Sequence, residues 1–453
     1  MFRIKRVSVS AFNQSRPSSH LHLKPSKPLN QMRNLNSKPS RLKSTTSPLK
    51  NIKVLDCSRI LAGPFAAQML GDMGAEVIKI EEPRKGDDTR WLKTLKESNE
   101  SNFKSTSSLS NYFISCNRNK KSLTLNLKDQ KGIEIFKRLV KDSDVLIENF
   151  MVGKMEELGI GYEVLKTINP NLIYSNISGF GSTGPLSSLP GYDVIAAAQS
   201  GLMSITGEPD RSPMKIGVAL SDLITGIYTS YGILVSLYQR DVNQNRIGGQ
   251  KVESSLFESS LSVLANIGSS YLNSNENGQR WGTQHPSIVP YQAFETSDAY
   301  MIVGTTNDRQ FQRLCDVLDL PSLKTNPLYS TNSSRVTNRL KLIEIINQKL
   351  KSQSTSEWLK KFKTSGLPHS KINSIQEGFD ESQSFEREMI VEIDCEMSKT
   401  GKIKLIGIPI KLSETPGQIQ FAPPELGQHN QEILMKLGYN LENIHQFKKD
   451  GVI

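Results

Sequence analysis

Short apolar segments alternate with helical segments through the first half of the chain, and this alternation is the strongest limit on its fold. Residues 53–56 are a short apolar run, 64–73 a helical segment with Pro64 in its first turn, and 75–80 a second apolar run. Strand, helix and strand in this order predict a βαβ unit, whose two strands lie parallel in one sheet. Further strands are predicted at 123–127, 144–148 and 172–178, and a helix at 129–141. We therefore expect an α/β fold built on a parallel sheet.

The second half of the chain contains a possible domain boundary. The polar residues 268–285 predict a loop that ends the large domain, and the region after them has its own strand and helices. We expect a large domain at 51–250, to which 390–453 return, and a small domain at 270–389. The elements expected here are helices at 194–202, 254–267, 308–317, 335–352 and 430–437, strands at 251–253 and 300–303, and a strand pair within 389–412.

A long apolar helix is predicted from Leu220 onward. Apolar residues recur at steps of three and four from 220 to 235, which is typical of a buried helix. Asp222 lies in its first turn, and Ser221 before it is a plausible N-cap. The positive end of the helix dipole should lower the pKa of Asp222 and keep the carboxylate ionised. An ionised carboxylate beside an apolar wall is a usable nucleophile, although such an acid can also serve only as a helix cap.

The segment 179–184 fits the GxGxxG pattern after a predicted strand. That pattern alone suggests dinucleotide binding, but Pro185 follows where a long helix should begin, and no acidic residue clearly ends a second strand further on. We interpret the segment as a glycine-rich turn that lines a pocket. The backbone N–H groups of Gly179, Gly181 and Gly184 are candidates for stabilising an oxyanion.

The first 50 residues account for the whole positive charge of the protein. They contain eleven Lys or Arg residues and no acidic residue, and without them 45 basic residues balance 45 acidic residues. This Arg- and Ser-rich composition predicts a disordered mitochondrial transit peptide, with a basic tail that is never removed as the alternative. Nucleic-acid binding is not expected, because the remaining chain carries no net charge. No run reaches 18 apolar residues, so we expect no membrane partner.

The cysteines and histidines predict neither a disulfide framework nor a metal site. Four cysteines are far apart, and no pair has CxxC spacing. The histidines after residue 50 also lack the spacing of metal ligands. We expect a reducing compartment and no metal.

Several motifs occur together in a specific order. They are SRILAGP at 58–64, GDMGAEVIK at 71–79, NRNKKS at 117–122, ENF at 148–150, SGFG at 178–181, PGYD at 190–193 and VALSD at 218–222. In order and spacing the chain resembles the class III CoA-transferases over about residues 51–440. The segments 204–207 and 281–294 are most similar to the branch of that family that uses succinyl-CoA and glutarate.

The resemblance implies a fold, a reaction and a set of site residues. The fold would be a large Rossmann-like domain with a smaller α/β domain, in an interlocked homodimer of the mitochondrial matrix. The reaction would move CoA from an acyl-CoA, such as succinyl-CoA, to a dicarboxylic acid such as glutarate, with covalent intermediates on Asp222 and no permanently bound cofactor. Coenzyme A thioesters would be the substrates. The residues that match the family's CoA contacts are Ala62, Leu125, Lys128, Asn149, Phe150 and Tyr192.

Two departures from the family pattern affect these expectations. A basic residue that binds a CoA phosphate in some members falls at Glu82 here, so Arg84 or Lys85 would have to replace it. The four-glycine run of formyl-CoA transferase is absent, so formyl-CoA is not expected as a substrate, and the segment around His285 would have to exclude water instead. His285 itself is interpreted as a structural hydrogen-bonding residue rather than as a base. The candidates for pairing with carboxylate or phosphate groups, left open among themselves, are Arg59, Arg90 and Arg118.

Two alternative functions follow from the same residues. An α-methylacyl-CoA racemase would share the fold and the aspartate, but its partner histidine falls at Tyr192, and a tyrosine with a pKa of about 10 is a poor proton-exchanging base. A CoA-binding protein without catalytic activity is the second alternative, against which the pair Asp193 and Asp222 argues.

Overall fold

The computed structural model describes residues 47–243 and 248–453. Most of the predicted transit peptide, residues 1–46, therefore lies outside the described residues. Residues 47–50 form a turn, and the backbone N–H of Leu49 donates to the carbonyl oxygen of Met73 at 3.0 Å. Leu49 also packs against buried residues of the sheet. The folded part thus includes the last residues of the predicted leader.

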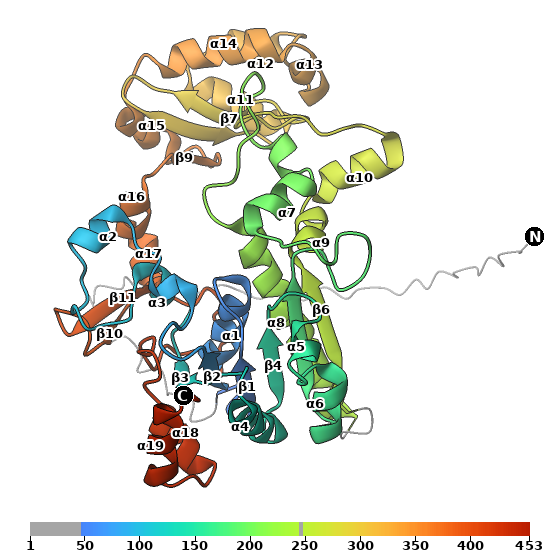
Figure 1. Ribbon diagram of the computed structural model, residues 1–453. Helices are drawn as coiled ribbons and strands as arrows, with labels where there is room; N and C mark the ends of the chain where they lie inside the picture. Colours follow the sequence, from blue (N-terminus) through green and yellow to red (C-terminus); the bar gives the residue numbers. More distant parts are fainter. Residues whose placement is uncertain (1–46, 244–247) are drawn as a thin grey trace, which may run out of the picture. The chain divides into compact units, whose positions relative to one another are not determined.

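The centre of the fold is a six-stranded sheet in the order β3-β2-β1-β4-β5-β6, with every pair parallel (Figure 1). This is the strand order of the doubly wound Rossmann fold, and it confirms the expected α/β class. The predicted strands are present, although the third begins at Lys120 rather than at Leu123. The strands are β1 (Lys53–Asp56), β2 (Glu76–Glu81), β3 (Lys120–Thr124), β4 (Val145–Glu148), β5 (Ile173–Ser178) and β6 (Lys251–Ser255).

Side chains alternate between two buried layers on the two faces of this sheet. Val54 and Ile147 face one layer, which also holds residues of α1 (Ala62–Asp72) and α8 (Leu220–Val242). Leu55 and Leu146 face the other layer, with α4 (Gln130–Lys141). The remaining helices that pack on this second layer are α5 (Lys154–Glu157), α6 (Tyr162–Ile168), α18 (Asn430–Lys436) and α19 (Leu441–Lys449). The period-two alternation of the strands thus builds a core on each face.

Helix α8 exists as predicted, but the face that it buries is the opposite of the predicted one. Its buried residues are mainly small or hydroxyl-bearing, including Thr225, Gly226, Thr229 and Ser230. A Cβ atom on Gly226 would lie 2.7 Å from the carbonyl oxygen of Ala62, so the backbones of α8 and α1 approach too closely for larger side chains. The hydroxyl of Thr225 donates to the carbonyl oxygen four residues earlier at 2.7 Å, which satisfies its buried polar atom.

The apolar stripe of α8 is exposed in the single chain. Tyr231 and Tyr238 are 66% and 71% exposed, and Ile227, Leu234 and Val235 are exposed as well. Of the described helices, only α8 is long and apolar enough to cross a membrane by length and composition. Its opposite face nevertheless packs along α1, α9 (Leu256–Ser262) and β6. The stripe is the main apolar surface of this helix that the residues of 47–243 and 248–453 leave uncovered.

The region after the parallel sheet forms a further small sheet with its own core. β7 (Tyr291–Glu295), β8 (Tyr300–Gly304) and β9 (His369–Lys371) are antiparallel, and the buried residues beside them all lie within 289–367. The predicted loop 268–285 is wrong in its first part, because α10 (Ala265–Ser274) continues into it. The helices of this region are α11 (Asp308–Val317), α12 (Ser322–Thr325), α13 (Asn332–Thr337), α14 (Arg339–Leu350) and α15 (Thr355–Phe362). The domain boundaries themselves stay a prediction.

The last part of the chain returns to the parallel sheet. The predicted strand pair is confirmed as the antiparallel β10 (Ile390–Asp394) and β11 (Lys402–Ile406). Helix α18 follows as predicted, but α19 then closes the chain and was not predicted. The other short helices are α2 (Leu95–Asn99), α3 (Asn111–Ser115), α7 (Asp193–Gln199), α16 (Ile375–Asp380), α17 (Ser382–Glu386) and the 3₁₀ turns η1 (Asp88–Arg90) and η2 (Leu202–Ile205).

Candidate active site

The strand order places a crevice between the carboxyl ends of β1 and β4. In open parallel sheets ligands bind where the strand order reverses, which is here between these two strands. The segments that follow β1 and β4 contact each other through Asn149. Its side-chain oxygen accepts the N–H of Arg59 at 2.9 Å, and its amide donates to the carbonyl oxygen of Arg59 at 2.8 Å. Asn149 therefore joins the two segments that form the walls of the crevice.

Two cavities of about 410 and 200 Å³ adjoin in this crevice and share Arg59, Phe150 and Lys154. Asp222 lines the larger cavity and Lys128 the smaller one. Asp222 and the six residues that match the family's CoA contacts each line one of the two cavities: Ala62, Asn149, Phe150, Tyr192 and Asp222 the larger, and Leu125, Lys128 and again Phe150 the smaller. Residues from distant parts of the sequence thus form one groove, with a carboxylate toward one end and an exposed lysine toward the other.

Asp222 lies in the first turn of α8, but Ser221 is not its N-cap. The N-cap position is Ala219, which offers no side-chain hydrogen bond. Instead, a side-chain oxygen of Asp193 accepts the N–H groups of Ser221 at 2.7 Å and of Asp222 at 3.3 Å. The hydroxyl of Ser221 accepts a hydrogen bond from Ser260 at 2.8 Å. A carboxylate at the start of α7 thus performs the capping that we expected of Ser221.

The pKa of Asp222 moves in the direction opposite to our expectation. Burial of the carboxyl group and the nearby Asp193 carboxylate raise the pKa of Asp222 to about 7. The first turn of a helix favours the anion, but in this protein burial and the like charge have the larger effect. Among the described residues no group donates a hydrogen bond to the side chain of Asp222. The Asp222 carboxylate is therefore not held by a hydrogen bond within the groove, and its pKa lies near neutral pH.

Tyr112 lies within the electrostatic influence of Asp222, which we did not predict, although it lines neither of the two cavities. It lies on α3, and burial together with the nearby Asp222 carboxylate raises the pKa of Tyr112 to about 12. Its phenol is thus protonated at neutral pH and is available as a hydrogen-bond donor near Asp222. Tyr112 comes directly after a Ser- and Asn-rich stretch that reads as a surface loop, so the sequence alone gave no sign of this proximity.

The glycine-rich turn lines the groove only through Gly179. A Cβ atom on Gly179 would lie 2.5 Å from the Cα atom of Gly191, so two backbone segments touch at this point. Gly181 and Gly184 have φ values of 93° and 86°, which favour glycine, but neither lines the described cavities. The turn therefore brings the end of β5 against the segment that carries Tyr192.

Replacing Gly179 with alanine is expected to destabilise the protein by about 1–3 kcal/mol and to lower its activity, because the new methyl group must separate two backbones. Thermal unfolding and turnover measure the two effects. Gly378→Ala is the matched control, since this helical glycine has open space around it. Equal stability and activity of Gly179→Ala and Gly378→Ala would contradict the close contact.

Of the three candidate arginines, only Arg59 lines the groove. Arg90 is fully buried and donates two hydrogen bonds to Glu81, at 2.8 and 2.7 Å. Arg118 is bound in the same manner by Asp72, with its shortest contact at 2.7 Å. Arg59 is 47% exposed and pairs with Asp88 at 3.1 Å. Arg90 and Arg118 are thus committed to internal partners, which leaves Arg59 as the candidate for a substrate anion.

The proposed replacements for the missing phosphate-binding residue do not line the groove, and Lys154 does. Lys85 pairs with Asp88 at 3.1 Å, and neither Lys85 nor Arg84 lines the two cavities. Lys154 lines both cavities and pairs with Glu157 at 2.6 Å. Lys154 was not predicted as a site residue, because it lies in the short helix α5, which was not predicted either.

His285 makes the local contacts expected of a structural histidine. Its Nδ1 accepts the N–H of Ser287 at 3.1 Å, and its ring packs against the ring of Tyr291 with centroids 5.6 Å apart. No group of three or more potential metal ligands is found in the part of the chain that the structure describes. All four cysteines are free and buried.

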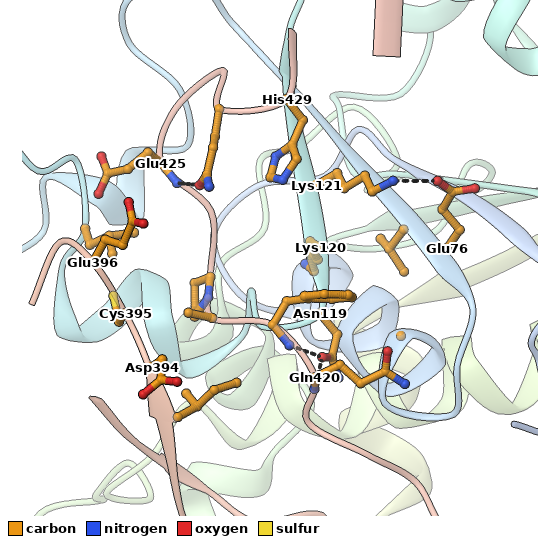
Figure 2. A pocket seen from close by; sticks show the side chains of 18 of the residues that line it. Glu76, Asn119, Lys120, Lys121, Asp394, Cys395, Glu396, Gln420, Glu425 and His429 are labelled. Atoms are coloured by element: carbon orange, nitrogen blue, oxygen red, sulfur yellow. Dashed lines mark hydrogen bonds and ion pairs between the residues drawn. The ribbon is translucent and has the colours of Figure 1, made fainter. Parts of the chain in front are cut away.

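A larger cavity of about 850 Å³ contains none of the predicted site residues. Figure 2 shows its lining, with Lys121 directed toward Glu76 and with His429, Glu425 and Glu396 around the space. Lys121 bonds Glu76 at 2.9 Å and Glu432 at 2.8 Å, which ties α18 to the sheet. Since neither Asp222 nor Lys128 lines this cavity, we place the reaction in the crevice between β1 and β4.

The Rossmann strand order, with a free carboxylate in the crevice where that order reverses, defines an α/β protein with one extended ligand groove. The sequence matches CoA-transferase family III over residues 49–430. A succinyl-CoA:glutarate CoA-transferase of Homo sapiens is 41% identical over 418 residues, which cover 92% of each chain. An acyl-CoA transferase of Fusarium pseudograminearum is 42% identical over 422 residues, 92% of this chain and 91% of that relative.

A solved structure agrees with this match. A CAIB/BAIF family protein from Brucella suis superposes with a TM-score of 0.76 at 37% identity, covering 86% of this chain and 99% of its own. The chain therefore belongs to CoA-transferase family III. It is an enzyme of the class III CoA-transferase type, and coenzyme A thioesters are its substrates.

Proposed function

We propose that this enzyme transfers CoA from succinyl-CoA to glutarate through covalent intermediates on Asp222. The observation that carries the proposal is the Asp222 carboxylate, which lines a groove long enough to reach Lys128 and receives no hydrogen bond from the described residues. The succinyl-CoA:glutarate CoA-transferase of Homo sapiens, at 41% identity, supports the choice of donor and acceptor.

The first half of the reaction moves CoA onto the enzyme. The Asp222 carboxylate attacks the thioester carbonyl of succinyl-CoA, the carbon–sulfur bond breaks, and CoA thiolate leaves a mixed anhydride behind. The thiolate then attacks the carbonyl carbon of Asp222, which releases succinate and forms a thioester between Asp222 and CoA. Dividing the exchange into two attacks on activated carbonyl groups lowers each barrier.

The second half repeats these steps with the acceptor acid. A glutarate carboxylate attacks the Asp222 thioester, which expels CoA thiolate and forms a second mixed anhydride. The thiolate attacks the glutaryl carbonyl, and glutaryl-CoA leaves with the Asp222 carboxylate restored.

The groove residues would hold CoA along its length. Lys128 and Lys154 would pair with the phosphate groups, because a charged donor and a phosphate form a strong hydrogen bond. Leu125 and Phe150 would contact the apolar parts of CoA, while Tyr192 and the backbone at Ala62 would lie beside the thioester. Asn149 would contact CoA from the cavity wall, where its amide also holds the backbone of Arg59.

Incubation of the purified protein with succinyl-CoA and ¹³C-labelled glutarate tests the proposal. Mass spectrometry should detect labelled glutaryl-CoA and free succinate in equal amounts. The protein incubated with succinyl-CoA alone should gain the mass of CoA less one water. Absence of glutaryl-CoA would reject this acceptor, and a second series with shorter and longer dicarboxylic acids would then identify the class. Exchange of the α-proton of a branched acyl-CoA without CoA transfer would favour the racemase.

The homodimer and the mitochondrial matrix are part of this proposal. The exposed apolar stripe of α8, which includes Tyr231 and Tyr238, supports association with a second copy, since such a surface is unfavourable in water. Sedimentation velocity should give the mass of a dimer, and a monomer at micromolar concentration would reject it. The acid-free leader supports import, and a fluorescent fusion that remains in the cytosol would reject that assignment.

A further inference from the structure

Residues 58–60, which follow β1, form a wall of the groove without any hydrogen bond between backbone groups. Each N–H and C=O group of these three residues is bonded by a side chain instead. The N–H of Ser58 donates to Asp56 at 3.0 Å, and its carbonyl oxygen accepts from Lys79 at 2.8 Å. Secondary structure therefore contributes nothing to the shape of this turn, which depends on side chains from other parts of the chain.

The next two residues are held in the same way. Both backbone groups of Arg59 bond to Asn149, and the N–H of Ile60 donates to Asp87 at 3.2 Å. The carbonyl oxygen of Ile60 accepts from the thiol of Cys116 at 3.6 Å. Ile60 has a φ of 73°, which is unfavourable for a β-branched residue by about 1–3 kcal/mol. The turn would relax from this conformation unless its surroundings held it.

Four fully buried charged side chains lie beneath the turn. Lys79 pairs with Asp87 at 2.9 Å, and Lys120 pairs with Asp56 at 2.8 Å. Lys120 also donates to the carbonyl oxygen of Pro64 at 2.8 Å, in the first turn of α1. The two lysines thus hold the carbonyl groups of Ser58 and Pro64, at the two ends of residues 58–64. The two aspartates hold the N–H groups of Ser58 and Ile60.

Stability alone does not explain these buried charges. Apolar side chains of similar volume are often as stabilising as a buried ion pair, because charges lose their hydration on burial. Burial alone would raise the pKa of Asp87, but the ammonium of Lys79 and the N–H of Thr89 lower it to about 2. Burial would likewise raise the pKa of Asp56, and Lys120 and Lys79 lower it. Both aspartates therefore stay ionised, and their contacts to the turn account for their presence.

We propose that Lys79 and Lys120 are positioning residues for the CoA-transfer reaction. They act through the turn 58–64, which places Arg59, Ile60 and the start of α1 in the groove beside Asp222. Both side chains are fully buried, and their ammonium groups are bonded within the protein. The kinetic part of this inference rests on the proposed function, whereas the structural part does not.

Substitution of either lysine by methionine, which keeps the volume and removes the charge, tests the proposal in the full chain. With Lys79→Met or Lys120→Met we expect kcat/KM for the acyl-CoA to fall about 100-fold, mainly through kcat, because a misplaced groove wall no longer aligns the thioester with Asp222. Hydrogen–deuterium exchange should rise in the peptide that covers 57–66 and stay unchanged in α8.

Arg118→Met is the matched control. Arg118 belongs to an ion pair with Asp72 whose side chains are only 7% and 5% exposed, but it contacts neither the turn nor the groove. Measured below its own melting temperature, this variant should keep the kcat/KM of the unmodified protein and the exchange of 57–66. Equal losses in the lysine variants and in Arg118→Met would assign the lysines to general stability and overturn the proposal.

Two additions keep the result decisive. If the methionine variants do not fold, Asp87→Asn removes the charge that faces Lys79 and keeps an oxygen for the N–H of Ile60. For this variant we expect a smaller loss of kcat/KM and a smaller rise in the exchange of 57–66. If the unmodified protein does not convert succinyl-CoA and glutarate, the proposed function fails, and exchange of 57–66 together with calorimetric CoA affinity still tests the lysines. Unchanged exchange and unchanged CoA affinity would then overturn the positioning role.

Discussion

An Asp222→Asn protein is expected to form glutaryl-CoA at least about 10⁴-fold more slowly than the unmodified protein, because an amide does not attack the thioester. The intact mass of the variant should not increase when succinyl-CoA is added. Asp222→Ala should behave in the same way, although it also opens space in the groove. Glutaryl-CoA formation at an unchanged rate by both variants would exclude Asp222 as the nucleophile.

The same substitution is expected to stabilise the protein above neutral pH. The pKa of Asp222 in the folded protein, about 7, is higher than the 3.8 of an unperturbed aspartate. For an acid whose pKa is raised by folding, the favourable contribution is complete below the unfolded pKa and is lost as the pH rises through the folded pKa. The amide of the Asp222→Asn variant carries no charge. The variant should therefore be no more stable than the unmodified protein at pH 4, and its gain in stability should be complete at pH 8.

Melting temperatures of the two proteins across this pH range measure the effect. The variant should melt a few degrees higher at pH 8, and the two should melt together at pH 4. A variant that is inactive and also less stable at pH 8 would indicate a general structural defect. The combination of lost activity and gained stability is the signature of a group held in an unfavourable state for catalysis.

Asp193→Asn is expected to shift the pH dependence of the reaction toward lower pH. Only the ionised form of Asp222 attacks, so kcat/KM should rise with pH up to about 7, the pKa of Asp222, and then level. The negative charge of Asp193 is the second cause of this raised pKa, after burial. Removing that charge lowers the pKa of Asp222, and the variant should keep more of its maximal activity at pH 6.

The asparagine variant separates charge from structure. Its side-chain oxygen can still accept the N–H groups of Ser221 and Asp222, so the start of α8 stays capped. Asp193→Ala loses both the charge and the cap, and it should lose stability as well as shift the profile. An unchanged pH profile of Asp193→Asn would mean that burial alone sets the pKa of Asp222.

The sequence predicted the centre of the parallel sheet well because β1, β2 and β4 contain short apolar runs. The βαβ unit of β1, α1 and β2 is present almost to the residue, and α4 begins after Asp129, which caps it as its residue type predicts. α10 and α19 were not predicted, since polar residues on exposed helices resemble those of loops. Local pattern was thus sufficient for the buried strands and insufficient for exposed helices.

The periodicity of α8 predicted a helix but not which face is buried. A hydrophobic stripe normally marks the core, and here it is the small face with Gly226 that meets α1. The sequence of α8 does not indicate that the backbone of α1 packs directly against Gly226. For the same reason the pKa of Asp222 was predicted in the wrong direction, because Asp193 and the burial come from other elements.

The family motifs located the groove residues, but their individual contacts come from the tertiary structure. Asn149 lines the groove, and its two hydrogen bonds to the backbone of Arg59 were not predicted. Arg90 and Arg118 could not be distinguished from Arg59 in the sequence. Their internal partners, Glu81 for Arg90 and Asp72 for Arg118, lie on other secondary-structure elements. Residue type indicated the chemistry, and the fold determined which residues are available for it.

The unequal support of the groove walls indicates where the acceptor specificity of this enzyme can be altered. The wall at 58–60 is fixed by buried partners, so a substitution there disturbs several strands at once. The larger cavity is also lined by Met151, Val152 and Leu189, whose apolar side chains are about half exposed. A library confined to these three positions should change the preferred length of the acid while the fold and the nucleophile remain intact.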